Sequence, residues 1–107
     1  MDIQLKRDIL EVCVLSALLS ADSYGYQIIK DVSPYLTISE STLYPILRRL
    51  ESAGCLTTYS LEHSSRLRKY YSITPQGVAR IQEFLKEWKS VMELYSYIKG
   101  EYDREQA

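Results

Sequence analysis

Arginine, hydroxyl and tyrosine side chains gather on one face of a single predicted helix. Apolar residues recur there at i, i+3, i+4 and i+7, so they should face a core. They are Leu43, Ile46, Leu47 and Leu50. At about 100° per residue the opposite face and its flanks are polar. These carry Ser41, Thr42, Tyr44, Pro45, Arg48 and Arg49. Guanidinium and hydroxyl groups in such an array can bind base edges and phosphates, which favours a nucleic-acid partner.

The ends of this helix are marked in the sequence. Ser39 is the predicted N-cap with Thr42 at N3, and the free N–H groups of that first turn suit a phosphate. Pro45 removes one N–H inside the helix and should kink it slightly. Gly54 is the predicted C′ residue that ends it.

A hairpin should follow directly, with strands at residues 55–61 and 66–73 around a polar turn at 62–65. The second strand begins with three cations, Arg66, Arg68 and Lys69, where a wing would meet a phosphate backbone or a minor groove. The alternative is a solvated edge strand whose charges prevent aggregation. The position directly behind an arginine-bearing helix favours the wing.

Three separated motifs together resemble the PadR-like transcriptional regulators. They are Tyr24-Gly25-Tyr26 with Ile28-Ile29, residues 41–51 with Gly54, and residues 68–77. The resemblance covers about residues 8 to 88. It implies a homodimeric winged-helix repressor that places helix 41–49 and the wing on double-stranded DNA; repression rests on the resemblance alone. The length is similar to that of the short branch, which has one C-terminal helix.

Composition bounds the architecture. A chain of 107 residues with 46% hydrophobic content makes one small core that a dimer partner would enlarge. We predict a mainly α fold with a small β-hairpin wing: a winged helix-turn-helix domain at 1–74 and a dimerisation helix at 75–107, packed with the first helix as one compact unit. No apolar run of about 18 residues occurs, and segment 13–19 lacks the flanks of a signal peptide. The chain is therefore expected to be cytoplasmic, without a membrane partner.

Net charge alone would argue against a nucleic-acid binder, because it is −1 with a pI near 5.8. The distribution reverses this conclusion. Residues 41–80 hold six Lys and Arg against two Glu, a local charge of +4, and the remainder carries −5. The positive charge thus lies on the predicted arginine-bearing helix, the hairpin and the start of the last helix, and the acidic remainder should orient the protein on DNA.

The first half of the chain should supply two further helices. Residues 5–20 are apolar on more than one face, including Ile9, so this helix must be buried on two sides and needs a partner subunit. Residues 21–23 should form a turn and N-cap before a helix from Tyr24 to about residue 32. Tyr24 and Tyr26 either stack or hydrogen-bond at the DNA side or simply pack.

The last helix should start with Thr74 as N-cap and Pro75 at N1. Its apolar residues then alternate at spacings of three and four, a coiled-coil type of seam that predicts dimerisation. They are Ile81, Phe84, Trp88, Val91, Tyr95, Ile98 and Tyr102. A membrane-surface helix is the alternative, but the polar face mixes Glu with Lys, whereas such helices prefer a cationic face.

Trp88 is the only tryptophan, and two-fold symmetry could bring it near its mate across the dimer interface. In some PadR-like regulators a similar tryptophan lines a cavity that sandwiches flat aromatic or cationic compounds. The resemblance therefore implies a small aromatic or phenolic effector for Trp88. The alternative is a packed interface tryptophan without a ligand.

The remaining residues that could do chemistry give little indication of function. Cys13 and Cys55 are expected to be small buried hydrophobes, with redox sensing the less favoured interpretation, and His63 is expected to be solvated. Four scattered glycines form no phosphate-cradling loop, and no metal or catalytic constellation appears, so we predict neither an enzyme nor a cofactor. The remaining alternative is a winged-helix protein-interaction module, which should expose an apolar patch on helix 41–49.

Overall fold

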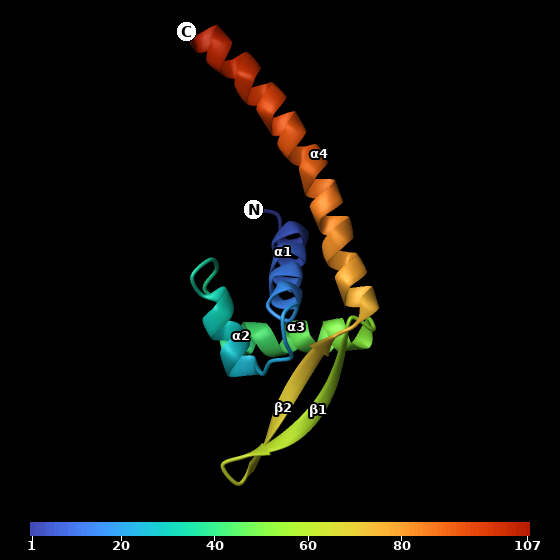
Figure 1. The fold of residues 1–107 in the computed structure, drawn as a ribbon. Helices are drawn as coiled ribbons and strands as arrows, with labels where there is room; N and C mark the ends of the chain where they lie inside the picture. The colour runs from blue at the N-terminus through green and yellow to red at the C-terminus, as the bar shows by residue number, and fades with distance from the viewer.

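The computed structural model describes all 107 residues as four helices and one hairpin (Figure 1). The elements in chain order are α1 (Ile3–Ser16), α2 (Gly25–Val32), α3 (Glu40–Ser52), β1 (Leu56–His63), β2 (Arg66–Ile73) and α4 (Pro75–Gln106). Helices α1 to α3 lie together, the hairpin extends from them on one side, and α4 extends far beyond them on the other. The predicted mainly α fold with a β-hairpin wing is confirmed.

The core lies among α1, α2, α3 and the base of the hairpin. The predicted apolar face of α3 is confirmed, because its four apolar residues are all at most 2% exposed. They pack with Val14 and Leu15 of α1 and Ile28 of α2, which are fully buried. This packing fixes α3 so that its opposite face points outward.

Both predicted ends of α3 are confirmed. The Ser39 hydroxyl accepts a hydrogen bond from the Thr42 N–H at 3.3 Å. Gly54 has a φ of +77°, its N–H donates to the Glu51 carbonyl, and the Cys55 N–H donates to the Leu50 carbonyl. This pair of bonds is a Schellman ending, which requires the left-handed backbone that glycine allows.

The predicted boundaries of the first two helices need correction. Helix α1 ends at Ser16, not at residue 20, because the next residues form tighter i−3 hydrogen bonds that bring Leu18 into the core. Ser23 is not an N-cap either. Its backbone pairs with Tyr71 of β2 in both directions, at 3.2 and 2.8 Å, and Tyr24 occupies the N-cap position without a side-chain bond.

The hairpin is longer than predicted. The strands pair in register from Leu56 opposite Ile73 to His63 opposite Arg66, so only Ser64 and Ser65 form the turn. Both serines have positive φ, 51° and 67°, as two-residue turns of type I′ require. That turn matches the twist of the strands, which therefore stay paired to the tip.

Helix α4 begins as predicted, with the Thr74 hydroxyl accepting a bond from the Gly77 N–H at 3.1 Å and Pro75 in the first turn. Its proximal part packs on α1, where Ile81 is buried and Phe84 covers the core. Beyond Trp88, the distal half (residues 91–106) leaves large apolar side chains exposed. They are Val91, Met92, Leu94, Tyr95, Tyr97, Ile98 and Tyr102. No helix, α4 included, combines the length and the apolar character needed to cross a bilayer.

Candidate nucleic-acid interface

The start of α2, the outward face of α3 and strand β2 meet around one open cavity of about 580 Å³. We call its lining the reading surface, which consists of Tyr24, Gly25, Tyr26, Tyr44, Arg48, Arg68, Lys69 and Tyr71. Five of these residues were predicted to bind DNA, and they come from three elements that are distant in sequence. Three cations line the cavity and no carboxylate does, so the lining of the reading surface carries a net positive charge.

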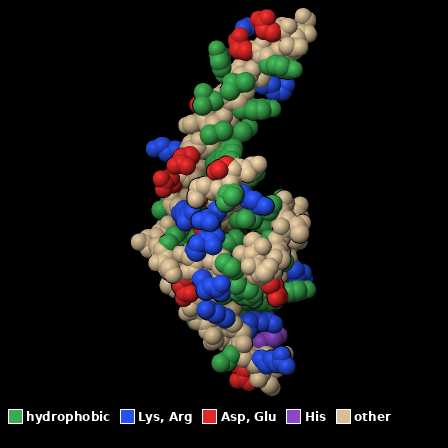
Figure 2. Space-filling view, turned by 180° about the vertical axis from the view of Figure 1, so that it is seen from behind, with side chains coloured by type: hydrophobic (Ala, Val, Ile, Leu, Met, Phe, Trp, Pro, Cys, Tyr) green, Lys and Arg blue, Asp and Glu red, His purple; other side chains and the backbone are tan.

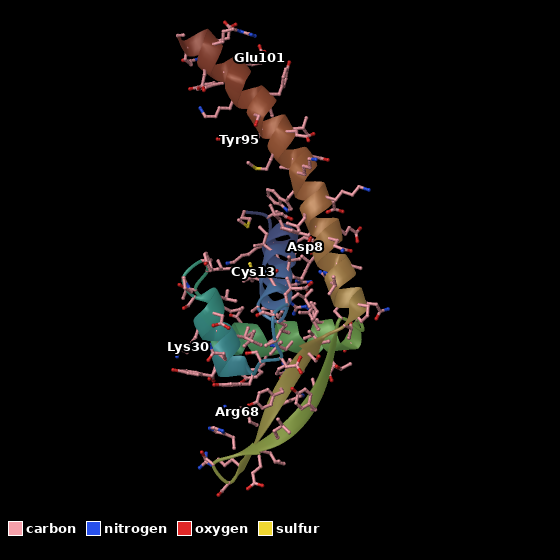
Figure 3. All side chains as sticks on the ribbon, in the orientation of Figure 1. Asp8, Cys13, Lys30, Arg68, Tyr95 and Glu101 are labelled. Carbon is pink, nitrogen blue, oxygen red and sulfur yellow. The ribbon has the colours of Figure 1, made fainter.

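Arg68 is held in place by stacked tyrosines. Its guanidinium carbon lies 3.9 Å from the ring centroid of Tyr24, a close cation–π contact. Tyr70 packs edge-on against Tyr24, with centroids 5.6 Å apart, and lies parallel to Tyr59 at 5.5 Å. Figure 3 shows Arg68 projecting from the hairpin toward the side of α2. The arginine is thus positioned before any ligand arrives.

A second contact fastens the hairpin to the chain before α2. The Tyr59 hydroxyl donates to Asp22 at 2.7 Å, and this hydrogen bond is the main reason why the pKa of Tyr59 is raised above its ordinary value. Together with the Ser23–Tyr71 backbone pair, it joins the hairpin to the helical domain. The wing is therefore a fixed part of the surface.

Tyrosines of the reading surface fit closely around Gly25. A Cβ atom at Gly25 would lie 2.5 Å from the Tyr44 hydroxyl, so a larger residue there would displace the Tyr44 ring from the start of α2. Tyr71 forms the buried floor, and burial is the main cause of its raised pKa. Sequence reasoning did not assign Gly25 or Tyr71 to the site, although both stand in the quoted motifs, and it left Tyr26 open between a DNA contact and packing.

Ser41, Thr42 and Pro45 were predicted at the same site, but they line a different shallow hollow beside the start of α1. There the Ser39 hydroxyl is hydrogen-bonded to the hydroxyls of Ser41 and Thr42 at 2.9 and 3.1 Å. Lys6 and Arg7 of α1 border this hollow. Sequence reasoning missed both, because only the fold brings the N-terminal helix next to the start of α3.

The consecutive arginines of α3 have different surroundings. Arg48 borders the reading surface and forms no ion pair, whereas the Arg49 Nε donates to Glu11 of α1 at 3.2 Å. Arg66 lies at the exposed tip of the hairpin, away from the cavity. Figure 2 shows the resulting distribution, with Lys and Arg over the middle and the hairpin end and hydrophobic side chains along α4.

Comparison with known proteins identifies the family. The profile of the "Transcriptional regulator PadR-like family" matches residues 14–83, about two thirds of the chain. The chain belongs to the PadR-like family. The resemblance inferred from the three motifs is confirmed, and the protein is a transcriptional regulator.

The chain is also similar to solved structures and to a curated protein. A transcriptional regulator from Clostridium thermocellum superimposes with a TM-score of 0.77 and 32% identity, covering 87% of this chain and 95% of that one. A PadR family regulator from Clostridium difficile gives a TM-score of 0.76 at 28% identity, with 83% and 96% covered. An uncharacterised protein from Lysinibacillus sphaericus is 37% identical over 90 residues, 79% of this chain and 83% of the relative.

The PadR-like chain presents no group of three or more His, Cys, Asp or Glu residues that could hold a metal ion. Its two cysteines are not bonded to each other: Cys55 is buried, and Cys13 is partly buried with a pKa raised by that burial. The side chains that line the reading surface can supply hydrogen bonds, positive charge and aromatic faces.

Proposed function

We propose that this PadR-like protein is a homodimeric repressor that binds a pseudo-palindromic operator through its reading surface. The observation that carries the proposal is the cavity where Arg48, Arg68 and Lys69 converge without a carboxylate. Cations that converge without acidic partners attract an external anion, and DNA supplies a regular array of phosphates. The +4 charge of residues 41–80 agrees with this.

Within this proposal α3 enters the major groove. Arg48 lies near the middle of the exposed face and is free to make bidentate contacts with a guanine. Tyr44 and Thr42, nearer the start of α3, would contact phosphates. We leave Arg49 out of the base contacts, because its Nε is engaged by Glu11.

The wing would lie on the neighbouring backbone. Arg68 and Lys69 point to opposite faces of β2, over Tyr24 and Tyr71 respectively, and both border the cavity. Arg66 at the exposed tip would reach further along the DNA. Since Arg68 is already stacked in place, it would lose little side-chain entropy on binding.

The dimer would form through α4 and α1. An apolar groove between α1, the end of α2 and the proximal part of α4 has a volume of about 530 Å³. Its apolar lining includes Ile9, Cys13, Leu19, Phe84 and Leu85. The exposed seam of a second copy's distal half offers apolar residues of the kind that would fill it. Such a dimer would place two reading surfaces on one face, as a symmetric operator requires.

Release by a small aromatic or phenolic effector completes the proposal. Trp88 is half-buried against Phe84, with ring centroids 5.8 Å apart, where the packed and exposed parts of α4 meet. Titrating planar aromatic cations and phenolic acids against Trp88 fluorescence tests it. Saturable quenching that tracks DNA release and vanishes in Trp88→Phe supports an effector; a flat response across the panel leaves Trp88 as interface packing.

Selection from random double-stranded DNA tests the whole proposal. The wild-type protein should enrich a motif with two inverted half-sites, and the isolated motif should bind one dimer. Enrichment of no sequence above the input, or of a motif without two-fold symmetry, would refute operator binding by a symmetric dimer.

A further inference from the structure

A single buried carboxylate joins three helices. The Glu11 side chain on α1 is only 6% exposed, and Glu11 is the one charged residue in the core. Its Oε1 accepts a bond from the Arg49 Nε of α3 at 3.2 Å, and its Oε2 accepts one from Arg80 of α4. Asp8, one turn earlier on α1, lies 3.9 Å from Arg80. A buried charge is costly unless paired, so Glu11 holds both arginines strongly.

A second link joins α3 and α4 where one ends and the other begins. The Thr74 hydroxyl donates to the Gly54 carbonyl at 2.6 Å, and the Thr74 N–H donates to the Cys55 carbonyl at 3.0 Å. Gly77 packs so closely there that a Cβ would lie 2.5 Å from the Cys55 carbonyl oxygen. This corner acts as a joint between the two helices.

Two separate connections link α3 and α4: the corner at Thr74 and the ion pairs of Glu11. Together they determine the angle between the two helices. Arg49 precedes Gly54 by five residues and Arg80 follows Thr74 by six. At about 1.5 Å per residue, both arginines therefore lie roughly 7 to 9 Å from the joint along their helices. Glu11 connects these two arginines and so fixes the distance between the helices away from the joint. Without it, the corner alone leaves α4 free to pivot against α3 to the extent that core packing allows.

We propose that Glu11 is a positioning residue that sets the angle between α3 and α4, and so the separation of the two reading helices in the dimer. This inference rests on the proposed function, in which α3 reads DNA and α4 dimerises. The spacing of half-sites on DNA follows from the geometry of the dimer. Glu11 therefore determines which operator spacing the protein prefers, although it never touches DNA.

The alternative is that the Glu11 network contributes only to stability. The two roles differ in what they change. Loss of stability alone lowers binding to all operators by the same factor, through the fraction of folded protein. Loss of positioning changes the relative binding to operators of different spacing and broadens the angle between the helices.

The first experiment measures the angle without DNA. Spin labels at Glu40→Cys on α3 and Lys89→Cys on α4, in a background with Cys13→Ala and Cys55→Ala, report one distance within a subunit when labelled protein is diluted with unlabelled protein. We expect a single narrow distance distribution that shifts or broadens on Glu11→Gln. An unchanged distribution would overturn the proposal, whether or not the protein binds DNA.

The second experiment varies the number of base pairs between the selected half-sites. Changing the spacing by one or two base pairs should lower wild-type binding by about tenfold or more, a loss of the size of a mismatched base pair. Glu11→Gln and Arg80→Gln should flatten this profile, while Asp103→Asn, which removes an exposed ion pair with Lys99, should leave it unchanged. Arg80 is one third exposed, so its variant serves if Glu11→Gln fails to fold. Folded variants that keep the wild-type profile, with a uniform loss of affinity, would assign the network to stability only.

Discussion

The reading surface and the distal half of α4 lie far apart in the molecule, and each lacks a different kind of partner (Figure 1, Figure 3). The reading surface has cations without carboxylates, whereas the distal half has apolar side chains such as Tyr95 and Ile98 that are more than half exposed. Water solvates an unpaired cation well, but exposed apolar area costs about 25 cal/mol per Å². We infer that the DNA contact can be transient and that the dimer contact should be permanent.

Two adjacent residues of α3 also differ in whether they have a partner. The Arg49 Nε pairs with the buried Glu11 carboxylate, and Arg48 has no acidic partner. A count of positive charges treats them alike. Pairing, which only the fold reveals, separates a structural arginine from one that is available to DNA.

Breaking the seam should have the largest effect. Val91→Asp combined with Ile98→Asp places two charges in the proposed interface, so we expect a monomer by sedimentation. Operator affinity should then fall by about 10² to 10⁴-fold, because the two half-sites are no longer bound together. Ser96→Asp, on the polar edge of the same stretch, is the matched control. A monomer that binds the operator as tightly as the wild type would remove the dimer from the mechanism.

Removing the free arginine comes next. Arg48→Ala should weaken operator binding by about 1 to 3 kcal/mol and relax the preference at one base pair in each half-site. Fluorescence anisotropy on the operator, its single-base variants and random DNA measures both effects. Lys99→Ala on distal α4 should change neither. Equal losses on operator and random DNA would make Arg48 a phosphate contact.

Local patterns allowed much of this structure to be predicted from the sequence. The apolar face of α3, its caps at Ser39 and Gly54, and the start of α4 at Thr74 and Pro75 follow from periodicity and from capping chemistry within a few residues. The end of α1 was missed, because Leu18 leaves the helix to join the core. That is a tertiary effect that helix propensity does not contain.

The site was predictable in part for the same reason. The reading surface includes Tyr24, Tyr44, Arg48 and two cations of the wing, all of which were predicted from the sequence to bind DNA. The role of Glu11 was invisible, since it lies 38 residues from Arg49 and 69 from Arg80 in the chain. The only indication in the sequence was a charged residue in an apolar helix, and this did not show which residues Glu11 would pair with.

The wing should give a smaller but distinctive effect. Alanine at Arg66, Arg68 and Lys69 should lower the slope of log K against log salt by about 0.9 for each phosphate that the variant no longer neutralises, and a dimer carries two wings. The control is alanine at the α4 lysines, which changes the net charge equally. They are Lys86, Lys89 and Lys99. A wing variant with the salt slope of the wild type would show that the wing is not on the backbone.

The smallest effect concerns stability at high pH and involves the Tyr59–Asp22 hydrogen bond, which attaches the wing to the helical domain. The hydrogen bond to Asp22 raises the pKa of Tyr59 above 10.0, so the unfolded state loses this proton first and stability should fall as the pH rises past 10. Thermal melts between pH 8 and 11 should show a shallower decline for Tyr59→Phe. Tyr71 and Cys13, whose pKa values are also raised, remain in both proteins. Identical declines would mean that the bond is absent in solution.

The most direct test of the reading surface is photocrosslinking to operator DNA from two matched positions. Tyr26 on the reading surface and Tyr97 on distal α4 are 61% and 68% exposed, so a benzophenone amino acid fits at either. We expect a covalent DNA adduct from position 26 and none from position 97. An adduct from position 97 alone, or none from position 26 in a variant that still binds the operator, would contradict DNA binding by the reading surface.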